Sequence, residues 1–386
     1  MRDEYMNIHT VQPISSLGQF LEIEKLWREL HAASSTQSIF LSFEYVHLWY
    51  TCFAKPEQVR IYPVFKENTL IGFLPLILRR RGPIRVLSSL INDHCLHAGP
   101  LILHGEEEAF YRGARSMLLS EKHKWDLFEY HGGYSFQDFI KHEELLVRDF
   151  PVIEQTFPTY TILLPTSFEE YFNHHISAKL RKNAKSERSK LKKVSSYNFR
   201  HYEEDMGKRH WPELLSVEDS GWKGKEGTSI KRLNREYQLY YEKLVELLAR
   251  RKLLHLYVLE VDDRVIAGAF CYVDQDVFHY AKIGYDEAYA TLSPSNLLLM
   301  FIIEDIIQTL PLVRRIHLFP GDYGYKHRYI NEESSYTEYG IYSPTIPGKA
   351  LYYSRKAKEM IKRAPGVMPA IEAVRQHLNG TGKQLT

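Results

Sequence analysis

The sequence predicts an α/β protein of two similar domains, each with a mixed sheet flanked by helices. Three observations predict this fold class: a length of 386 residues, an alternation of helical and strand patterns, and the recurrence of one order of elements in both halves. A single core rarely grows past roughly 250–300 residues, so a chain of this length is expected to divide. A hydrophobic content of 44% and a charged content of 25% are typical of a soluble globular protein.

The first half predicts two helices and then a β-hairpin. Apolar residues recur at helical spacing over 21–33 and 43–53, and runs rich in β-formers cover 59–65 and 70–78. The turn at 66–68 joins these two strands. Pro63 and Pro75 lie inside them and predict sheet edges or bulges, because proline donates no ladder hydrogen bond.

The second half repeats this order, with helices at 211–217 and 234–250 and strands at 254–261 and 265–273. A shift of 195 residues places Ile61 on Leu256 and Val64 on Leu259. Any two hairpins share such patterning, but the flanking helices recur as well, so we interpret the halves as an internal duplication.

A further strand at 277–283, a strongly apolar helix at 296–310 and a strand at 315–319 complete the second half. Strand–helix–strand of this kind predicts a parallel crossover. We expect an N-terminal domain over 1–160, a C-terminal domain over 161–345, and a basic helical tail over 346–386 that lies outside the main fold.

The start of the apolar helix is a candidate anion site. Ser293 suits the N-cap and Pro294 the first helical position. The N–H groups of Ser295, Asn296 and Leu297 would then point outward at the positive end of the helix dipole, which suits a pyrophosphate. The alternative is that Ser-Pro merely starts a buried helix.

Several short motifs, in this order, resemble the CelD-type acetyltransferases, a branch of the GNAT superfamily often linked to bacterial cellulose and exopolysaccharide production. The resemblance covers 160–345 well and 20–150 more loosely. Ser295 departs from it, because that branch usually has glycine there. The motifs are EDSGWKG at 218–224, GT at 227–228, IAGA at 266–269, YD at 285–286, LSP at 292–294, GD at 321–322 and YK at 325–326.

This resemblance implies two tandem GNAT-like domains, similar to the FemAB-like peptidyl transferases, with acetyl-CoA or another acyl-CoA as co-substrate. The pyrophosphate would rest on 290–296, and the pantetheine arm would run beside the strand at 277–283. Gly284 would let the thioester approach the backbone closely. The implied donor-binding residues are Gly284, Thr291, Leu292, Ser293, Ser295 and Asn296.

Acyl transfer to an amine also needs a base and an acid for the leaving thiolate. Glu218 and Asp322 are the candidate bases, and Tyr325, with Tyr323, is the candidate acid. Each carboxylate alone could equally be a cap or a solvated turn residue. The expected acceptor is a small-molecule amine, such as an amino sugar or amino acid, in polysaccharide or cell-envelope metabolism.

The stretch Lys179–Lys193 carries eight basic residues and one acid, Glu187. It predicts either a phosphate-binding face for tRNA or an anionic envelope precursor, or a solvated helix that links the domains. The histidines and cysteine of 93–97 are interpreted as structural, and we expect no metal.

Three dispersed cysteines, no apolar leader and no apolar run near twenty residues predict a cytoplasmic protein without a transmembrane segment. Three functions stay open: an acyl-CoA-dependent N-acyltransferase, an aminoacyl-tRNA-dependent FemAB-like transferase, and a catalytically silent GNAT-like scaffold.

Overall fold

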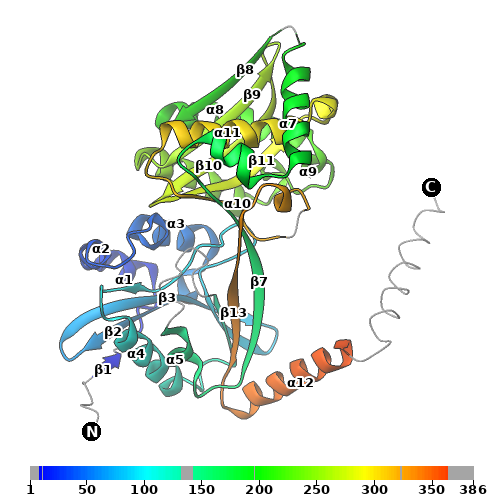
Figure 1. Cartoon of the computed structure of the whole chain (residues 1–386). Coiled ribbons are helices and arrows are strands. Elements are labelled where there is room, and N and C mark those ends of the chain that lie inside the picture. Colours follow the sequence, from blue (N-terminus) through cyan, green and yellow to red (C-terminus); the bar gives the residue numbers. More distant parts are fainter. Residues whose placement is uncertain (1–7, 11, 132–141, 195, 322–323, 364–386) are drawn as a thin grey trace.

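The computed structural model describes residues 8–10, 12–131, 142–194, 196–321 and 324–363. Two lobes are joined by a long two-stranded ribbon (Figure 1). The elements of the first half are β1 (Ile8–Thr10), α1 (Leu17–Glu22), α2 (Glu24–Ala32), α3 (Phe43–Phe53), β2 (Val59–Lys66), β3 (Thr69–Arg81), β4 (Ile84–Ser89), β5 (Leu101–Ile102), α4 (Glu107–Ser120), β6 (Leu127–His131), α5 (Glu143–Val147) and β7 (Val152–Leu163).

The second half continues with a similar series of helices and strands. They are α6 (Phe168–Glu170), α7 (Ala178–Leu191), β8 (Tyr197–Glu203), α8 (Glu204–Ser220), α9 (Trp222–Lys225), α10 (Arg235–Arg250), β9 (Leu254–Val261), β10 (Arg264–Asp274), β11 (Val277–Tyr285), the 3₁₀ helix η6 (Glu287–Leu292), α11 (Pro294–Thr309), β12 (Arg315–His317), β13 (Glu332–Tyr342) and α12 (Ile346–Arg363).

The two central hairpins confirm the internal duplication. All eight register pairs of β2 with β3 recur in β9 with β10 at a shift of 195, so that Val64 opposite Gly72 becomes Leu259 opposite Ala267. Both halves are mixed α/β domains that share this hairpin register, and the two domains follow one another in tandem.

One sheet runs through both domains in the order β1-β2-β3-β4-β6-β13-β7-β12-β11-β10-β9-β8. β4 is parallel to β6 in the first domain, and β11 is parallel to β12 in the second. Each domain takes its last strand from the other half of the chain, because β13 pairs with β6 and β7 pairs with β12. β7 therefore spans the predicted boundary at residue 160.

Opposite faces of β10 face separate layers of side chains, as the two-residue period of a strand requires. Phe270 and Tyr272 belong to a cluster with α8 and α10 that continues into the first domain. Ala269 and Cys271 pack with the apolar side of α11. Helices therefore cover both faces of the C-terminal sheet.

The domains meet through helices related by the duplication. Tyr45 on α3 and Tyr240 on α10, which are 195 residues apart, join hydroxyl oxygens at 3.2 Å. Contact between equivalent positions is the mark of an approximate two-fold relation. Asp274 also accepts from Ser38 Oγ at 2.5 Å and from Ile39 N at 3.0 Å.

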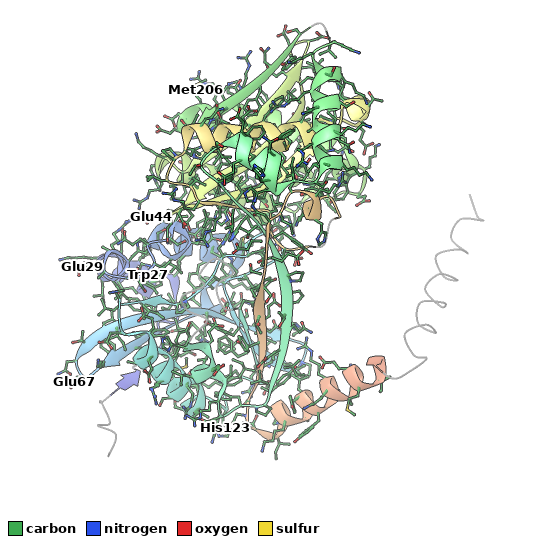
Figure 2. All side chains as sticks on the ribbon, in the orientation of Figure 1. Trp27, Glu29, Glu44, Glu67, His123 and Met206 are labelled. Carbon is green, nitrogen blue, oxygen red and sulfur yellow. The ribbon has the colours of Figure 1, made fainter. Side chains whose placement is uncertain are left out.

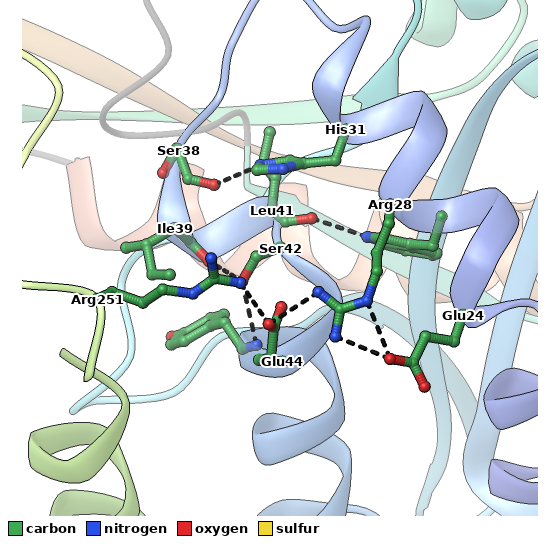
Figure 3. A network of polar contacts seen from close by, with 11 residues as sticks. Glu24, Arg28, His31, Ser38, Ile39, Leu41, Ser42, Glu44 and Arg251 are labelled. Carbon is green, nitrogen blue, oxygen red and sulfur yellow. Dashed lines mark hydrogen bonds and ion pairs between the residues drawn. The ribbon is translucent and has the colours of Figure 1, made fainter.

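Glu44 lies at the border of the two lobes (Figure 2). Its carboxylate pairs with Arg28 at 2.9 Å and with Arg251 of the second domain. Figure 3 shows this network, with Arg28 also held by Glu24. Charged and buried polar contacts thus fix one domain against the other.

The sequence predictions need four corrections. The helix expected over 21–33 breaks at Ile23, where the N–H turns to the carbonyl of Phe20. The helix at 211–217 extends over the whole of α8, and the strand at 315–319 ends at His317. The predicted tail is not wholly separate, because Tyr352 of α12 packs on Tyr342.

The prolines are tolerated inside paired strands for a local reason. Pro63 lies between the pairing of β1 with Val64 and the isolated bridge at Ile61. Pro75 lies between the segments of β3 that pair with β5 and with β4. Neither proline faces a recorded partner on its outer side, so no ladder bond is lost.

Candidate active site

The parallel strands β11 and β12 separate at one end, and a cavity opens there. They pair only from Val277 to His279 on β11. β11 continues to Tyr285, whereas the N–H of Leu318 turns to the carbonyl of Tyr160 at 2.9 Å. Phe319 then adopts a φ of 61°, a left-handed conformation that is strained for a bulky side chain.

The cavity has a volume of about 590 Å³ and lies at the border between the two domains. The C-terminal domain supplies the ends of β11 and β12, the end of α8 and the start of α11. The N-terminal domain supplies Phe40, Asp93, His94, Leu96 and His97. Aromatic side chains line much of the wall, including those of Tyr240, Tyr241, Phe270, Tyr272 and Tyr280.

Glu218 is the buried acid of this cavity, with 3% of its surface exposed. It lies in the last turn of α8. Its Oε1 accepts from Lys223 Nζ at 3.2 Å, and its Oε2 accepts from the N–H of Ile230 at 3.0 Å. The neighbouring Asp219 instead binds Ser229 and Arg232 and does not line the cavity.

Gly284 lines the cavity, and the structure gives a reason for glycine that the sequence did not show. A Cβ at this position would lie 2.4 Å from the Cα of Glu218. The close packing of α8 on β11 therefore requires glycine here, and the approach of a thioester stays a prediction. This packing holds Glu218 beside the end of the strand.

A β-bulge next to Gly284 directs a lysine to the cavity. Phe270 pairs with Lys282 and Cys271 with Tyr280, so Ala281 is the extra residue of β11. Lys282 Nζ lies 3.3 Å from His94 Nδ1 of the other domain. Burial, with the charge of Lys223 second, lowers the pKa of Lys282 to about 8. Burial also lowers the pKa of His94 to about 4, so the imidazole is neutral.

The start of α11 forms another wall, and Ser293 is its N-cap residue as predicted, but with an unexpected geometry. Ser293 has a left-handed backbone (φ 55°) and makes no side-chain cap bond, although Pro294 is the first helical residue as predicted. The N–H groups of Asn296 and Leu297 already donate to the carbonyl of Ser293, each at 3.1 Å. Of the three N–H groups expected to face an anion, only that of Ser295 has no acceptor recorded among the described residues.

Of the residues implied for donor binding, the cavity brings together Gly284, Ser295 and Asn296. Thr291, Leu292 and Ser293 do not line it, because η6 carries them outside its wall. Asn296 also donates weakly from Nδ2 to Glu187 at 3.4 Å.

The loop after β12 supplies Tyr325, which lines the cavity. Asp322 and Tyr323 lie outside the described residues. Lys326 is buried and donates to the carbonyls of Phe319, Pro320 and Gly321 at 2.7–3.1 Å. This lysine holds the loop in place.

The histidines of 93–97, interpreted as structural, include two that line the cavity. His97 is buried, bonds through Nε2 to Tyr272 OH at 2.8 Å and stacks on Phe40. Burial lowers its pKa to about 3. In the sequence, residues 93–97 are a polar run that follows a strand. Nothing in this run indicated that its histidines would line a cavity shared with the other domain.

The basic stretch forms α7, which packs on α11 through Leu180, Ala184 and Leu191. Arg188 pairs with Glu304 and lies over Phe301, so its charge is structural. α7 is therefore not a wholly solvated helix, because one side of it packs on α11 and Arg188 is paired. Its exposed members are Lys179, Lys182, Lys185, Lys190, Lys192 and Lys193.

The corresponding helix of the N-terminal domain is α4, the crossover between β4 and β6. It begins at Glu106, Glu107 and Glu108, whereas the first turn of α11 holds no acid. Three carboxylates at a helix start repel a phosphate, so the start of α4 is disfavoured as an anion site.

One group of side chains could hold a metal ion. Ligand atoms of His201, Glu203 and His255 lie within 4.8 Å of one another, away from the cavity. His201 Nε2 is 2.8 Å from His255 Nδ1, and Asp305 accepts from His201 Nδ1 at 3.1 Å. This chain of hydrogen bonds accounts for the histidines without a metal.

The three cysteines are buried free thiols. Burial raises the pKa of Cys52 to about 11 and that of Cys271 well above its ordinary value. A thiolate nucleophile is therefore disfavoured at these positions.

The splayed parallel strands, the helix that starts beside them and the cavity at their ends give the C-terminal domain a GNAT-like α/β fold. Residues 178–327 match the family model described as an acetyltransferase (GNAT) domain. No curated protein sequence matches this chain.

Solved structures share the architecture over most of the chain. FemX matches with a TM-score of 0.53 at 10% identity, covering 86% of this chain and 97% of FemX. The C-terminal domain of a putative lysylphosphatidylglycerol synthetase from Agrobacterium fabrum matches with a TM-score of 0.50 at 12% identity, covering 86% and 95%. At these identities the likeness establishes the fold alone. Among the described residues, no helix is long and apolar enough to cross a bilayer.

Proposed function

We propose that this protein transfers an acyl group from acetyl-CoA or another acyl-CoA to an amine. The observation that carries the proposal is a single cavity in which the splayed end of β11, the start of α11 and a buried carboxylate meet. These are the three parts that the reaction needs: a cradle for the donor, a backbone edge for the thioester, and a group that handles the proton.

The donor side is built from Ser295, Asn296 and the end of β11. The first turn of α11 holds no acidic residue of its own and offers partial positive charge, which suits a pyrophosphate, and the Glu187 carboxylate of α7 lies 3.4 Å from Asn296 Nδ2. The bulge at Ala281 interrupts the ladder, and N–H groups at such a place can stabilise the oxyanion of a tetrahedral intermediate.

On the acceptor side, the neutral amine attacks the thioester carbon directly. The new C–N bond forms, the C–S bond breaks, and the proton of the amine passes to a carboxylate while the thiolate takes a proton from an acid. Glu218 and Asp322 are the candidate bases, and Tyr325 is the candidate acid. Glu218 already accepts hydrogen bonds from Lys223 and from the N–H of Ile230, so its carboxylate is held in place and can position the amine where Asp322 takes the proton.

The acceptor class follows from the resemblance to the CelD-type branch. It favours an amino sugar or amino acid in exopolysaccharide or cell-envelope metabolism. The protein would act in the cytoplasm, where acyl-CoA is available and free thiols persist. The donor-binding domain would be 161–345.

A second candidate is a FemAB-like transferase that uses aminoacyl-tRNA. The exposed lysines of α7 favour it, since a row of basic side chains suits a polynucleotide backbone. A third candidate, a silent scaffold, would bind neither donor.

Thermal shift separates the three candidates, because a ligand specific for the folded state raises its melting temperature. Acetyl-CoA and a long-chain acyl-CoA should each be compared with free adenosine diphosphate and with tRNA. Stabilisation by an acyl-CoA supports the proposal, and stabilisation by tRNA alone transfers support to the second candidate. No shift with any ligand, together with no release of free thiol in the presence of mixed amines, would refute enzymatic acyl transfer.

A further inference from the structure

Helix α12 carries an apolar stripe that no other part of the described structure covers. A helix turns about 100° per residue. At this angle six side chains of α12 fall along one side of the helix. Four of them are large and well exposed: Ile346 (86%), Tyr353 (66%), Met360 (69%) and Ile361 (60%). Ala350 and Ala357, both exposed, complete the stripe. Isolated exposed apolar residues are ordinary, whereas an aligned row marks a contact surface.

The opposite side of α12 is fixed to the protein. The ring of Tyr352 packs on that of Tyr342, with centroids 5.4 Å apart, and Leu351 joins the same cluster. Arg355 donates to the hydroxyl of Tyr342 at 3.1 Å. Leu351 and Arg355 lie about half a turn around the helix from Tyr353 and Ala357. The stripe therefore faces directly away from the body, and the helix projects from the lower lobe (Figure 1).

Positive charge borders the stripe. Between 346 and 361 the helix holds four basic residues, Lys349, Arg355, Lys356 and Lys358, against one acid, Glu359, which gives a net charge of +3. Lys349 and Lys356 follow one edge of the stripe and Lys358 the other. All three lysines are exposed.

We propose that α12 lies in the interface of an anionic phospholipid membrane, with its apolar stripe against the acyl chains. A basic helix with one apolar side is the chemistry that such a surface recognises, because burial of the stripe and attraction to the head groups act together. The long lysine side chains reach the head groups from both edges while the stripe is immersed. This inference is independent of the acyl-transfer proposal.

The test is flotation of the full chain with vesicles of equal parts phosphatidylcholine and phosphatidylglycerol, compared with vesicles of phosphatidylcholine alone. The protein should float with the anionic vesicles and stay in solution with the neutral ones, and binding should weaken as salt is raised. The double variant Tyr353→Ser, Met360→Ser should lower the partition coefficient more than tenfold. The triple variant Lys349→Gln, Lys356→Gln, Lys358→Gln should do so as well.

The matched control is Leu21→Ser, Leu312→Ser, which removes two exposed leucines elsewhere, 46% and 79% exposed. It should bind anionic vesicles like the wild type. Equal binding by the wild type and the stripe variant, or no binding by the wild type, overturns the proposal. Self-association of the wild type in light scattering, lost in the stripe variant, overturns it in favour of a contact between copies. Circular dichroism checks that each variant is folded.

Discussion

The replacement Ser295→Asp tests the donor site most directly. It sets a negative charge in the first turn of α11, at the cavity wall. Two phosphate charges at a distance of ~5 Å from it cost about 1.7 kcal/mol even in a medium as polar as water, and several times more at an effective dielectric constant of about 20. Since 1.4 kcal/mol is about tenfold in affinity, acetyl-CoA should bind at least tenfold more weakly.

The fold should not suffer from this change, because an acid near a helix start stabilises the helix by roughly 0.3–1 kcal/mol. Ser295→Asn is the control, similar in shape to Asp but neutral. Isothermal titration calorimetry with acetyl-CoA at low and moderate salt measures both variants. Unchanged affinity in Ser295→Asp would place the phosphates elsewhere and refute the reasoning. A loss of equal size in Ser295→Asn would mean that space, not charge, decides.

Reversing the charges of Lys182 and Lys190 on α7 should leave acetyl-CoA affinity intact and lower the turnover of an anionic acceptor. If the kinetics of this variant equal those of the wild type at low salt, α7 has a structural role. Mass spectrometry of enzyme incubated with acyl-CoA alone should show no acyl adduct, and a stoichiometric adduct on Cys271 would overturn direct transfer. If Asp322 is the base, the replacement Asp322→Asn should lower kcat about 100-fold. Lys282→Met should raise the free energy of unfolding at pH 7 by on the order of 1–3 kcal/mol, because burial lowers the pKa of this ammonium from 10.5 to about 8 and the folded state binds the proton less tightly than the unfolded state. The destabilisation of the wild type by the buried ammonium is complete below pH 8 and disappears towards pH 10.5. Urea unfolding should therefore show a smaller difference in stability between the variant and the wild type at pH 9.5 than at pH 7. A variant less stable than the wild type at pH 7 would mean that the fold compensates the charge.

Local patterns predicted the elements whose signals are local. The bounds of α3 match the prediction, and α10 begins one residue late because Asn234 is its N-cap. The shift of 195 residues anticipated a register that holds pair by pair. Pro294 marked the start of α11 because proline loses nothing at that position.

Features that depend on distant partners were missed. The polar run that contains His94 and His97 reaches the cavity only because two domains pack together. Ser293 is the N-cap of α11 as the sequence predicts, but it also ends η6 with a left-handed backbone, and its side chain makes no cap bond. No local pattern distinguishes Glu218, which lines the cavity, from Asp219, which does not, since the packing of α8 on Gly284 decides it.

The placement of β13 has a consequence for synthesis on the ribosome. This strand lies between β6 and β7, near the middle of the sheet, although it is the last strand in the described part of the chain. Tyr342 pairs with Leu127, and translation at about 5–20 residues per second separates them by roughly 10–40 s. Through that interval β6 and β7 each present an unpaired edge to other nascent chains. The sheet of the N-terminal domain therefore stays incomplete until β13 has been made, and a fragment cut at the domain boundary would lack a strand from its sheet.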